Sequence, residues 1–389
     1  MNWTMNSFQK YRLMAPGPVP LHPEVLCQLS AEMVHHRTPL FDQVLKRALQ
    51  NLKKVFQTEQ PVMIVNGTGS TGMEAALVNL LSPGDEILCI NSGKFGERWR
   101  DMAKTFNYHV HTLDVQWGKA VNPQDVENFL NQNSQIKAVL TQACETSTAV
   151  LHPVQKLAAV VKKFPQTLFI VDAITAAGTL PLPMDEWGLD AVVAGSQKAF
   201  MLPTGLSFVA FSKKADLAFL NSSSPRFALD LRLEVQANKK GETYFSSSVA
   251  LIKALDKSLE VMLSMGLPKW YFEISRRSLF THFVFQKLNL KLFSESPSPS
   301  LTAAFVPEGI DGQKLREHLE SKYNLTVMGG QDQLKGKILR VGHMGYILDA
   351  DLMAFAGALF LSLQDFKTSN LPSEENFYQE CQNFLKDNV

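Results

Sequence analysis

The sequence predicts an α/β protein: a large domain with a mostly parallel sheet flanked by helices, and a smaller C-terminal α+β domain. Three observations carry this prediction. Short apolar segments alternate with longer amphipathic segments between Pro61 and Phe211, which is typical of βαβ units. A long helical segment then leads to the breaker Gly266-Leu267-Pro268, beyond which the order of the elements changes. The chain also has 389 residues, which is more than one hydrophobic core usually serves.

The elements of the large domain follow from hydrophobic period and boundary residues. Residues 1–25 are rich in proline and are expected to be irregular. Residues 24–56 have a helical period, which is interrupted at Pro39. The later segments are predicted to form strands at 61–65, 87–90, 109–115, 138–142, 168–171, 191–194 and 206–211, and helices at 70–81, 94–106, 123–131 and 154–164.

A long helix over 249–265 is predicted to end the large domain. Beyond the breaker, helices are predicted at 269–288, 312–322 and 349–364, and strands at 302–306 and 338–341. The polar stretch at the C-terminus is expected to be helical. We therefore divide the chain into an N-terminal arm (1–25), a large domain (26–267) and a small domain (268–389).

Composition and charge exclude several classes of function. The net charge of +1 gives no reason to expect a nucleic acid or an anionic membrane as partner. The longest apolar run, 352–361, is too short for a membrane span of about 20 residues. No signal peptide is expected, because residues 1–13 lack an apolar core. The four cysteines are Cys27, Cys89, Cys144 and Cys381. They are too scattered for a disulfide framework or a metal site, so we expect a cytoplasmic protein without a metal.

Two charged residues follow neighbouring apolar strands. Asp172 comes directly after Leu168-Phe169-Ile170-Val171, and Lys198 follows the strand at 191–194. The carboxyl ends of strands in an open α/β sheet form the edge where ligands bind. A lysine amine can form a Schiff base with an aldehyde, and an aspartate can keep a pyridine nitrogen protonated. These are the two protein groups that pyridoxal 5'-phosphate (PLP) chemistry needs most.

A glycine-rich loop supplies a candidate phosphate site. Gly67-Thr68-Gly69-Ser70-Thr71-Gly72 follows a predicted strand and opens a predicted helix, and it satisfies the dinucleotide pattern G-x-G-x-x-G. A dinucleotide site is disfavoured, because Asn91 stands where an acidic residue should bind the ribose. The free N–H groups at the start of the helix and the hydroxyls of the loop still favour a phosphate. With Lys198 and Asp172, the loop completes a candidate PLP site.

Seven motifs in a fixed order extend these observations over nearly the whole chain. They are Ala15-Pro16-Gly17-Pro18, His36-Arg37-Thr38-Pro39, Gly67-Thr68-Gly69-Ser70-Thr71-Gly72-Met73-Glu74-Ala75-Ala76, Gly93-Lys94-Phe95-Gly96-Glu97-Arg98, Val171-Asp172-Ala173, Gly195-Ser196-Gln197-Lys198-Ala199 and Leu339-Arg340-Val341-Gly342-His343-Met344-Gly345. With these motifs the chain resembles the class V aminotransferases of PLP fold type I, in the alanine–glyoxylate and serine–pyruvate branch.

The resemblance implies a role for each matching residue. Lys198 is expected to form the Schiff base and Asp172 to hold the pyridine nitrogen. Phe95 and Ile174 are expected on opposite faces of the cofactor ring, although many relatives have tryptophan in place of Phe95. The full set of expected cofactor contacts is Thr68, Gly69, Ser70, Phe95, Thr146, Asp172, Ile174, Gln197, Lys198, Thr243 and Ser246.

The resemblance also implies a substrate clamp and a dimer. Arg340 is expected to bind the substrate carboxylate, since a guanidinium presents two parallel donors. Thr243 and Ser246 are expected to reach the phosphate of the neighbouring subunit in a homodimer with shared active sites, although some relatives have tyrosine at 243. Arg37 is expected either to line the substrate entrance from the partner chain or to cap a helix.

The implied reaction is a ping-pong transamination between a small amino acid, alanine or serine, and a small 2-oxo acid, glyoxylate or pyruvate. Aspartate and glutamate are disfavoured, because no second carboxylate clamp accompanies Arg340. Two alternatives share the fold. A cysteine desulfurase or lyase is disfavoured by Gln197 before the lysine and by Cys381 in the polar tail, and a phosphoserine aminotransferase fits the motif around Arg340 less well. The third alternative is a non-catalytic accessory protein, such as a hydrogenase subunit.

Overall fold

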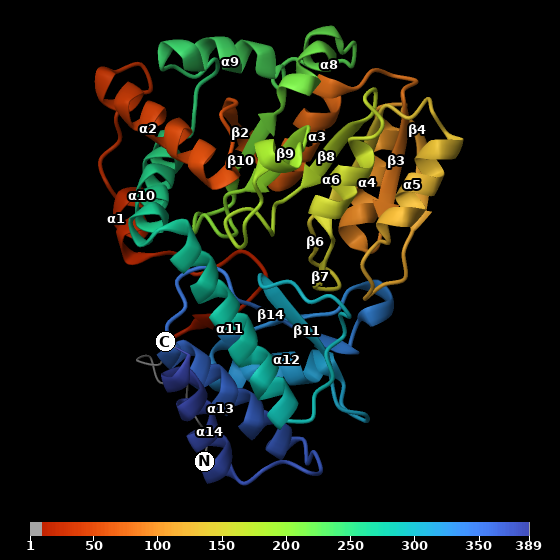
Figure 1. Ribbon diagram of the computed structural model, residues 1–389. Helices are drawn as coiled ribbons and strands as arrows, with labels where there is room; N and C mark the ends of the chain where they lie inside the picture. The colour runs from red at the N-terminus through yellow and green to blue at the C-terminus, as the bar shows by residue number, and fades with distance from the viewer. Residues whose placement is uncertain (1–9, 389) are drawn as a thin grey trace.

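The computed structural model describes residues 10–388 of the chain. The molecule has two parts, which Figure 1 shows one above the other. The upper part is built on a sheet covered by helices, and the lower part contains a small sheet with α11 to α14. The predicted fold class, a mostly parallel α/β sheet with a smaller α+β unit, is confirmed.

The large sheet has seven strands within the described residues, in the order β2-β10-β9-β8-β5-β3-β4. Four neighbouring pairs, from β9 across to β4, are parallel, whereas β10 is antiparallel to both β2 and β9. The strands are β2 (Val62–Gly67), β3 (Glu86–Asn91), β4 (His109–Asp114), β5 (Ala138–Gln142), β8 (Leu168–Asp172), β9 (Ala191–Gly195) and β10 (Gly205–Phe211).

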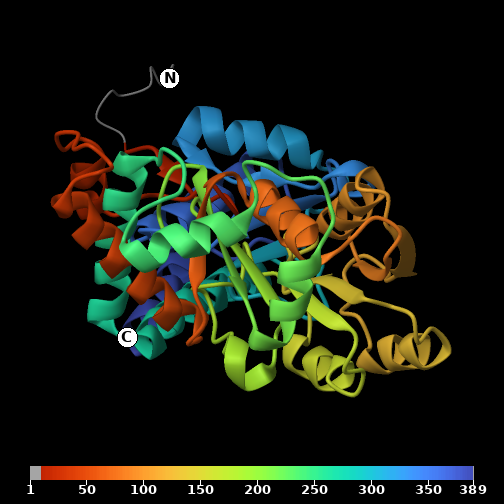
Figure 2. The same cartoon turned by 90° about the horizontal axis from the view of Figure 1, so that it is seen from above.

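The central strands are apolar throughout because both faces of the sheet are buried. Alternate residues of one strand enter different hydrophobic clusters: Val192 and Ala194 pack on one face, Ala191 and Val193 on the other. Viewed from above, helices surround the sheet (Figure 2). These helices are α1 (Pro23–Leu29), α2 (Pro39–Phe56), α3 (Gly69–Leu80), α4 (Lys94–Thr105), α5 (Pro123–Gln132), α6 (Val154–Val161), α7 (Met184–Trp187), α8 (Asp216–Asn221), α9 (Leu231–Lys240) and α10 (Val249–Met265).

The lower part begins where α11 (Leu267–Lys287) follows α10 across Gly266. Its three-stranded antiparallel sheet has the order β11-β14-β13. The elements are β11 (Leu301–Phe305), α12 (Gly312–Tyr323), β12 (Leu325–Thr326), β13 (Met328–Gly329), β14 (Ile338–Gly342), α13 (Asp349–Asp365) and α14 (Glu374–Asp387). The remaining elements are the hairpin strands β6 (Cys144–Glu145) and β7 (Val150–Leu151), and the 3-10 turns η1 (Lys213–Ala215) and η2 (Asp332–Leu334).

The expectation of irregular chain up to residue 25 was wrong at two places. The strand β1 (Arg12–Leu13) pairs in parallel with β12, which is more than 300 residues away along the chain. A local sequence pattern therefore could not predict this strand. Helix α1 begins at Pro23, because proline is well suited to the first helical position. The division into an arm and two domains stays a prediction, and one hydrophobic cluster joins the two parts, since it includes both Phe200 and Ile338.

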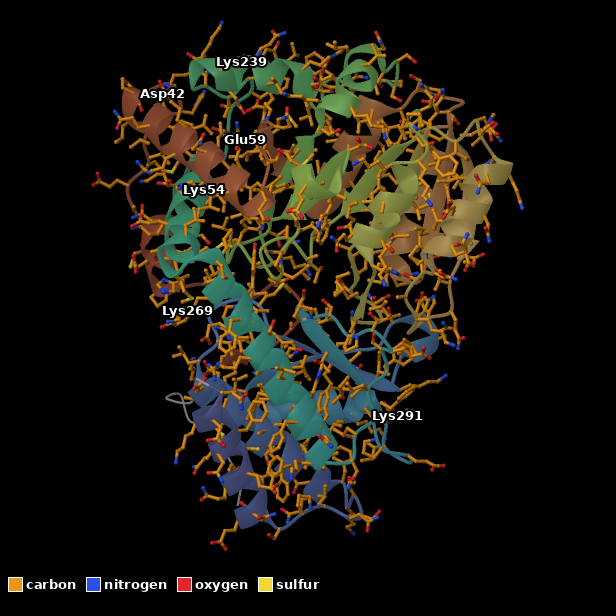
Figure 3. The ribbon with its side chains drawn as sticks, viewed as in Figure 1. Asp42, Lys54, Glu59, Lys239, Lys269 and Lys291 are labelled. Carbon is orange, nitrogen blue, oxygen red and sulfur yellow. The ribbon has the colours of Figure 1, made fainter. Side chains whose placement is uncertain are left out.

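Charged side chains lie on the outside of both parts. Figure 3 labels Asp42, Lys54, Glu59 and Lys239 on the upper part, Lys269 where the two parts meet and Lys291 on the lower part. Among residues 10–388, no helix has both the length and the apolar character needed to cross a membrane.

Candidate active site

The candidate site lies at the carboxyl edge of the large sheet, where the sheet faces the lower part of the molecule. In the sheet, β3 lies between β4 and β5, which are the next two strands of this sheet along the chain. The direction in which strands are added to the sheet therefore reverses at β3. Such reversals open a crevice beyond the carboxyl ends of the strands. The hairpin of β6 and β7 follows β5 at this edge and points toward the lower part (Figure 1).

Lys198 lies in the turn after β9 and is 8% exposed. Its Nζ donates a hydrogen bond of 2.5 Å to the carbonyl oxygen of Pro16. Burial lowers the pKa of Lys198 to about 8, and the charges of Arg340 and Arg98 act in the same direction. Some of the amine is therefore neutral near physiological pH, as a nucleophile requires.

Asp172 ends β8, the strand beside β9, and is 5% exposed. The Ile174 N–H donates to its Oδ1 at 2.8 Å. Burial raises the pKa of Asp172 to about 7, against which the Ile174 hydrogen bond and the charges of Arg98 and Lys198 act. Within the described chain this carboxylate has no ion pair, so a cationic ligand group beside it would offset the cost of its burial.

The N-terminal segment covers Lys198. Gly17 has φ +131°, and a Cβ atom built on it would lie 2.4 Å from the Lys198 Nζ. On its other side the segment contacts the lower part, because a Cβ on Gly342 would lie 2.1 Å from the Ala15 carbonyl oxygen. The Ala15-Pro16-Gly17-Pro18 motif thus places a backbone carbonyl against the candidate catalytic amine.

The phosphate loop has the predicted form. Thr68 is the N-cap of α3, and its N–H donates to the Thr71 Oγ1 at 3.2 Å, while Gly69 and Ser70 open the helix. Gly69 is tightly packed, since a Cβ there would lie 2.5 Å from the Ile174 Cδ1. The Oε1 of Gln197 is buried without a hydrogen-bond partner. A helix N-terminus, an unpaired carboxylate and a buried amine at one sheet edge fit PLP, with its phosphate, pyridine nitrogen and aldehyde.

The remaining contacts expected around the cofactor ring are also at this edge. Ile174 follows Asp172 and is 6% exposed, and Phe95 is the second residue of α4, after β3. Thr146 follows β6, and its Oγ1 shares a 2.8 Å hydrogen bond with the Thr175 Oγ1. The sheet therefore brings these three residues to the edge that holds Lys198 and Asp172.

Arg340 reaches the site from the lower part, on β14, and is 7% exposed. Its Nε donates to the Gly329 carbonyl oxygen at 2.9 Å, and its Nη1 donates to the Thr146 carbonyl oxygen at 2.9 Å. Burial lowers its pKa to about 10, and the charge of Glu145 acts against this. Both hydrogen-bond acceptors are neutral carbonyl groups. They hold the guanidinium in place but leave its positive charge unpaired, so the guanidinium can bind an incoming carboxylate.

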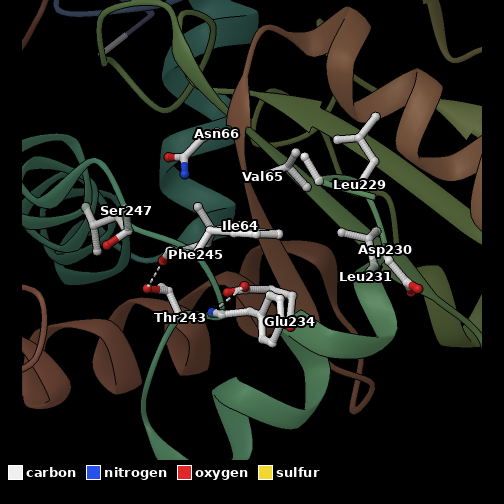
Figure 4. Close-up of a pocket in the computed structure, with 13 residues that line it drawn as sticks. Ile64, Val65, Asn66, Leu229, Asp230, Leu231, Glu234, Thr243, Phe245 and Ser247 are labelled. Carbon is white, nitrogen blue, oxygen red and sulfur yellow. Dashed lines mark hydrogen bonds between the residues drawn. The ribbon is translucent and has the colours of Figure 1, made fainter. Parts of the chain in front are cut away.

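Thr243 and Ser246 lie apart from this group, beside the end of β2. The Thr243 hydroxyl donates to the Phe245 carbonyl oxygen at 2.8 Å, and the Ser246 carbonyl oxygen accepts from the Asn66 side chain at 3.2 Å. Figure 4 shows this segment around a cavity of about 160 Å³, which Ile64 and Glu234 also line. Their expected contact with a neighbouring subunit stays a prediction.

Arg37, just before α2, contacts the segment that holds Thr243. Its Nη1 lies 3.0 Å from the Glu242 Oε2, and its Nη2 donates to the Tyr244 carbonyl oxygen at 3.4 Å. Of the two roles left open for Arg37, the cap of α2 belongs to the neighbouring Thr38 side chain, and a place at the substrate entrance of the partner subunit stays a prediction.

Sequence reasoning missed several polar groups at the site. They are the Pro16 carbonyl, Thr175, the guanidinium of Arg98 at 4.6 Å from the Phe95 ring centroid, and the buried Glu145. The motifs around Pro16 and Arg98 marked their segments but not their contacts. No group of three or more His, Cys, Asp or Glu side chains is arranged to hold a metal ion in residues 10–388.

Comparison with known proteins gives a family match over most of the chain. The family model described as "Aminotransferase class-V" matches residues 26–341. A protein of Anabaena cylindrica named "Soluble hydrogenase 42 kDa subunit" is 37% identical over 368 residues, covering 94% of this chain and 96% of that protein. The "L-aspartate--glyoxylate aminotransferase" of Paracoccus denitrificans is 34% identical over 353 residues, covering 89% and 88%.

A solved structure agrees with these sequence matches. The alanine–glyoxylate aminotransferase from Nostoc sp. superposes with a TM-score of 0.86 at 28% identity, covering 93% of this chain and 98% of that chain. The similarity therefore extends over both parts of the molecule.

Proposed function

Since the chain belongs to the class V aminotransferases and is a PLP-dependent transaminase, we propose that it moves an amino group from alanine or serine to glyoxylate or pyruvate. The observation that carries this proposal is the buried pair of Lys198 and Asp172 on neighbouring strand ends. An amine and a carboxylate are kept out of water at one sheet edge, and neither forms an ion pair within residues 10–388.

The proposed roles of these residues follow from their surroundings. When bound, PLP supplies an aldehyde that links to an amine and a ring that withdraws electrons from the substrate Cα. Lys198 would hold the cofactor through that aldehyde, and as a free amine it would carry the proton away from the substrate Cα as a general base. Its lowered pKa suits this task, because a general base works best near the pH of the reaction. Asp172 keeps the pyridine nitrogen protonated, and that positive charge would return the Asp172 pKa toward its ordinary range.

The substrate is proposed to lie between the two parts of the molecule. Arg340 binds its carboxylate, because the guanidinium is held by two carbonyl oxygens and has no acidic partner among the described residues. The phosphate is held by the loop at Thr68 and Ser70 with Gln197, and Phe95 and Ile174 lie against the ring. Burial of the site keeps water away from the reacting groups.

Two named relatives support glyoxylate as the acceptor, since both are called glyoxylate aminotransferases. One of them is named for aspartate, so aspartate is the main competing donor. Arg340 is the one buried arginine among residues 10–388, and a single guanidinium clamp favours donors with one carboxylate.

The experiment is a panel of amino donors and 2-oxo acid acceptors with the purified enzyme and two variants. Arg340→Lys should raise KM for both substrates about 10-fold or more, because an ammonium cannot reproduce the planar fork. Affinity for PLP should be unchanged. Arg316→Lys on the outside of α12, where the arginine faces Glu320 at 3.8 Å, is the matched control and should change nothing. Aspartate turning over faster than alanine and serine would refute the proposed donor, and an unchanged KM in Arg340→Lys would refute the clamp.

We also propose a cytoplasmic homodimer. All four cysteines are free thiols, which suits a reducing compartment. The segment that holds Thr243 exposes Tyr244 (45%) and Phe245 (37%), and the Phe227 ring beside Phe245 is 79% exposed. Neighbouring apolar side chains of this kind mark a surface that another protein covers. A second copy of the chain would bring Thr243 and Ser246 toward its partner's phosphate loop.

A further inference from the structure

A buried carboxylate outside the proposed set of reacting groups organises the start of α4. Glu145 is fully buried in β6. Its Oε2 accepts hydrogen bonds of 3.1 Å from the N–H groups of Phe95 and Gly96. Its Oε1 accepts from the N–H group of Ser147 at 3.1 Å and from the Ser147 hydroxyl at 2.5 Å. Donors face both oxygens, which is the arrangement that an ionised carboxylate requires.

Together, Glu145 and Ser147 replace the usual N-cap of this helix. The Lys94 N–H donates to the Ser147 Oγ at 3.1 Å, so the first three N–H groups of α4 are bound by residues of another strand and loop. The N-cap itself is Gly93, which has no side chain to offer. A Cβ there would lie 2.4 Å from the Ser147 Oγ and 2.6 Å from the Glu145 Cδ. Because Gly93 has no side chain, the Glu145 carboxylate fits beside the start of α4. The helix dipole also stabilises this carboxylate.

The same carboxylate links two parts of the proposed site. On one side it binds the N–H group of Phe95, which is proposed to lie against the cofactor ring. On the other side the next residue, Thr146, offers its carbonyl oxygen to the Arg340 Nη1. Burial raises the pKa of Glu145, and the hydrogen bonds from Ser147, Gly96 and Phe95 act against this. In its ionised form Glu145 also raises the pKa of both Asp172 and Arg340 through its charge.

We propose that Glu145 is a positioning residue for transamination: it fixes Phe95 and, through Thr146, Arg340 relative to the cofactor. This inference rests on the proposed function of the site. It assigns Glu145 no contact with the substrate or the cofactor. Small displacements at an active site lower rates strongly, since about 1 Å can cost about 100-fold.

The competing explanation is that Glu145 is a structural cap and nothing more, and the chain offers a matched control for it. Asp190 is another buried carboxylate, 2% exposed, and it accepts from the Phe169 N–H at 2.9 Å and the Ser212 hydroxyl at 2.8 Å. It precedes β9, whereas Lys198 follows that strand, so it lies at the opposite edge of the sheet. Asp190 also pairs with Lys214 at 3.0 Å, so its loss should cost at least as much stability.

The test compares Glu145→Gln with Asp190→Asn in the full-length enzyme. Both changes replace a buried carboxylate by an amide of nearly the same size, whose NH₂ faces donors. Both should lower the melting temperature. Glu145→Gln alone should also reduce the visible circular dichroism of bound PLP, weaken PLP binding to the cofactor-free enzyme about 10-fold, and raise KM for the 2-oxo acid about 10-fold. Asp190→Asn should leave these three readouts at the wild-type level.

Each outcome decides the inference. If Glu145→Gln matches Asp190→Asn in circular dichroism, PLP affinity and KM, the positioning role is overturned. If Glu145→Gln does not fold, Ser147→Ala takes its place, because it removes one donor to Glu145 and the acceptor of the Lys94 N–H. Ser147→Ala should shift the same readouts in the same direction, about threefold, and unchanged readouts overturn the inference. Failure of the wild-type protein to bind PLP would instead overturn the proposed function.

Discussion

At the scale of single residues, the site depends on two charged groups that are buried without an ion pair among residues 10–388. Burial raises the pKa of Asp172 and lowers the pKa of Arg340. Keeping these two groups buried therefore lowers the stability of the fold. A ligand with a protonated ring nitrogen and a carboxylate would supply both missing partners. Buried and perturbed groups gathered at one sheet edge are the usual mark of an active site.

The pKa of Asp172 gives a prediction for the cofactor-free protein. Its pKa is raised from 3.8 to about 7, so between these values the folded protein holds a proton that the unfolded chain has lost. Stability should therefore fall as the pH rises through this window, by about 3 kcal/mol. Asp172→Asn should remove this contribution. Urea unfolding of both proteins from pH 4 to pH 7 measures it, and an equal pH dependence in the two would show that Asp172 is not the titrating group.

At this scale, the sequence could predict functional residues that lie at the ends of strands. Lys198 and Asp172 could be predicted because each directly follows an apolar strand, and parallel strands bring their carboxyl ends to one edge. The contacts of Pro16 and Glu145 could not, because each joins segments that are distant in sequence and carry no periodic signal.

At the scale of elements, the N-terminal segment joins the two parts of the molecule over the site. It passes between Lys198 and the end of β14, where Gly17 and Gly342 allow a very close backbone approach. Elements with a strong hydrophobic pattern could be predicted within a few residues, such as β8 with its continuous apolar run and α2 with its helical period. The two-residue strands β1 and β12 could not, since their pairing depends on the final arrangement of the chain.

Substitution of Gly17 tests the close approach. Gly17→Ala would place a methyl group 2.4 Å from the Lys198 Nζ, and the residue has φ +131°. We expect PLP affinity to fall about 10-fold or more. Gly84→Ala is the matched control, because Gly84 also has a positive φ, +88°, but nothing within 4 Å of the added atom. It should cost about 1 kcal/mol of stability and leave PLP binding unchanged. Equal PLP titrations for the two variants would show that the segment does not constrain the lysine.

At the scale of the whole molecule, the site lies between two parts of one chain and is proposed to be completed by a second chain. Arg340 comes from the lower part and Lys198 from the upper part. The upper part could be predicted in outline because βαβ units have few arrangements. The relation of Thr243 and Ser246 to a partner depends on a second copy of the chain, which only the family resemblance suggested.

Mixed dimers test this shared site. One chain carries Lys198→Ala, and the other carries Thr243→Ala with Ser246→Ala, so that each homodimer is impaired. In a two-fold symmetric mixed dimer, one site combines both defects, whereas the other has intact Lys198, Thr243 and Ser246. Subunit exchange should therefore restore activity, at one fully competent site per mixed dimer. No recovery, with mixed dimers shown to form, would mean that the phosphate contacts are made within one chain.

The central claim is that Lys198 holds PLP, and borohydride reduction tests it most directly. Reduction of the yellow enzyme should attach the cofactor permanently to one peptide, and mass spectrometry of the digest should place it on Lys198. The Lys198→Ala variant should remain unlabelled and should have lost transamination. Label on a different lysine, or wild-type turnover by Lys198→Ala, would contradict the account.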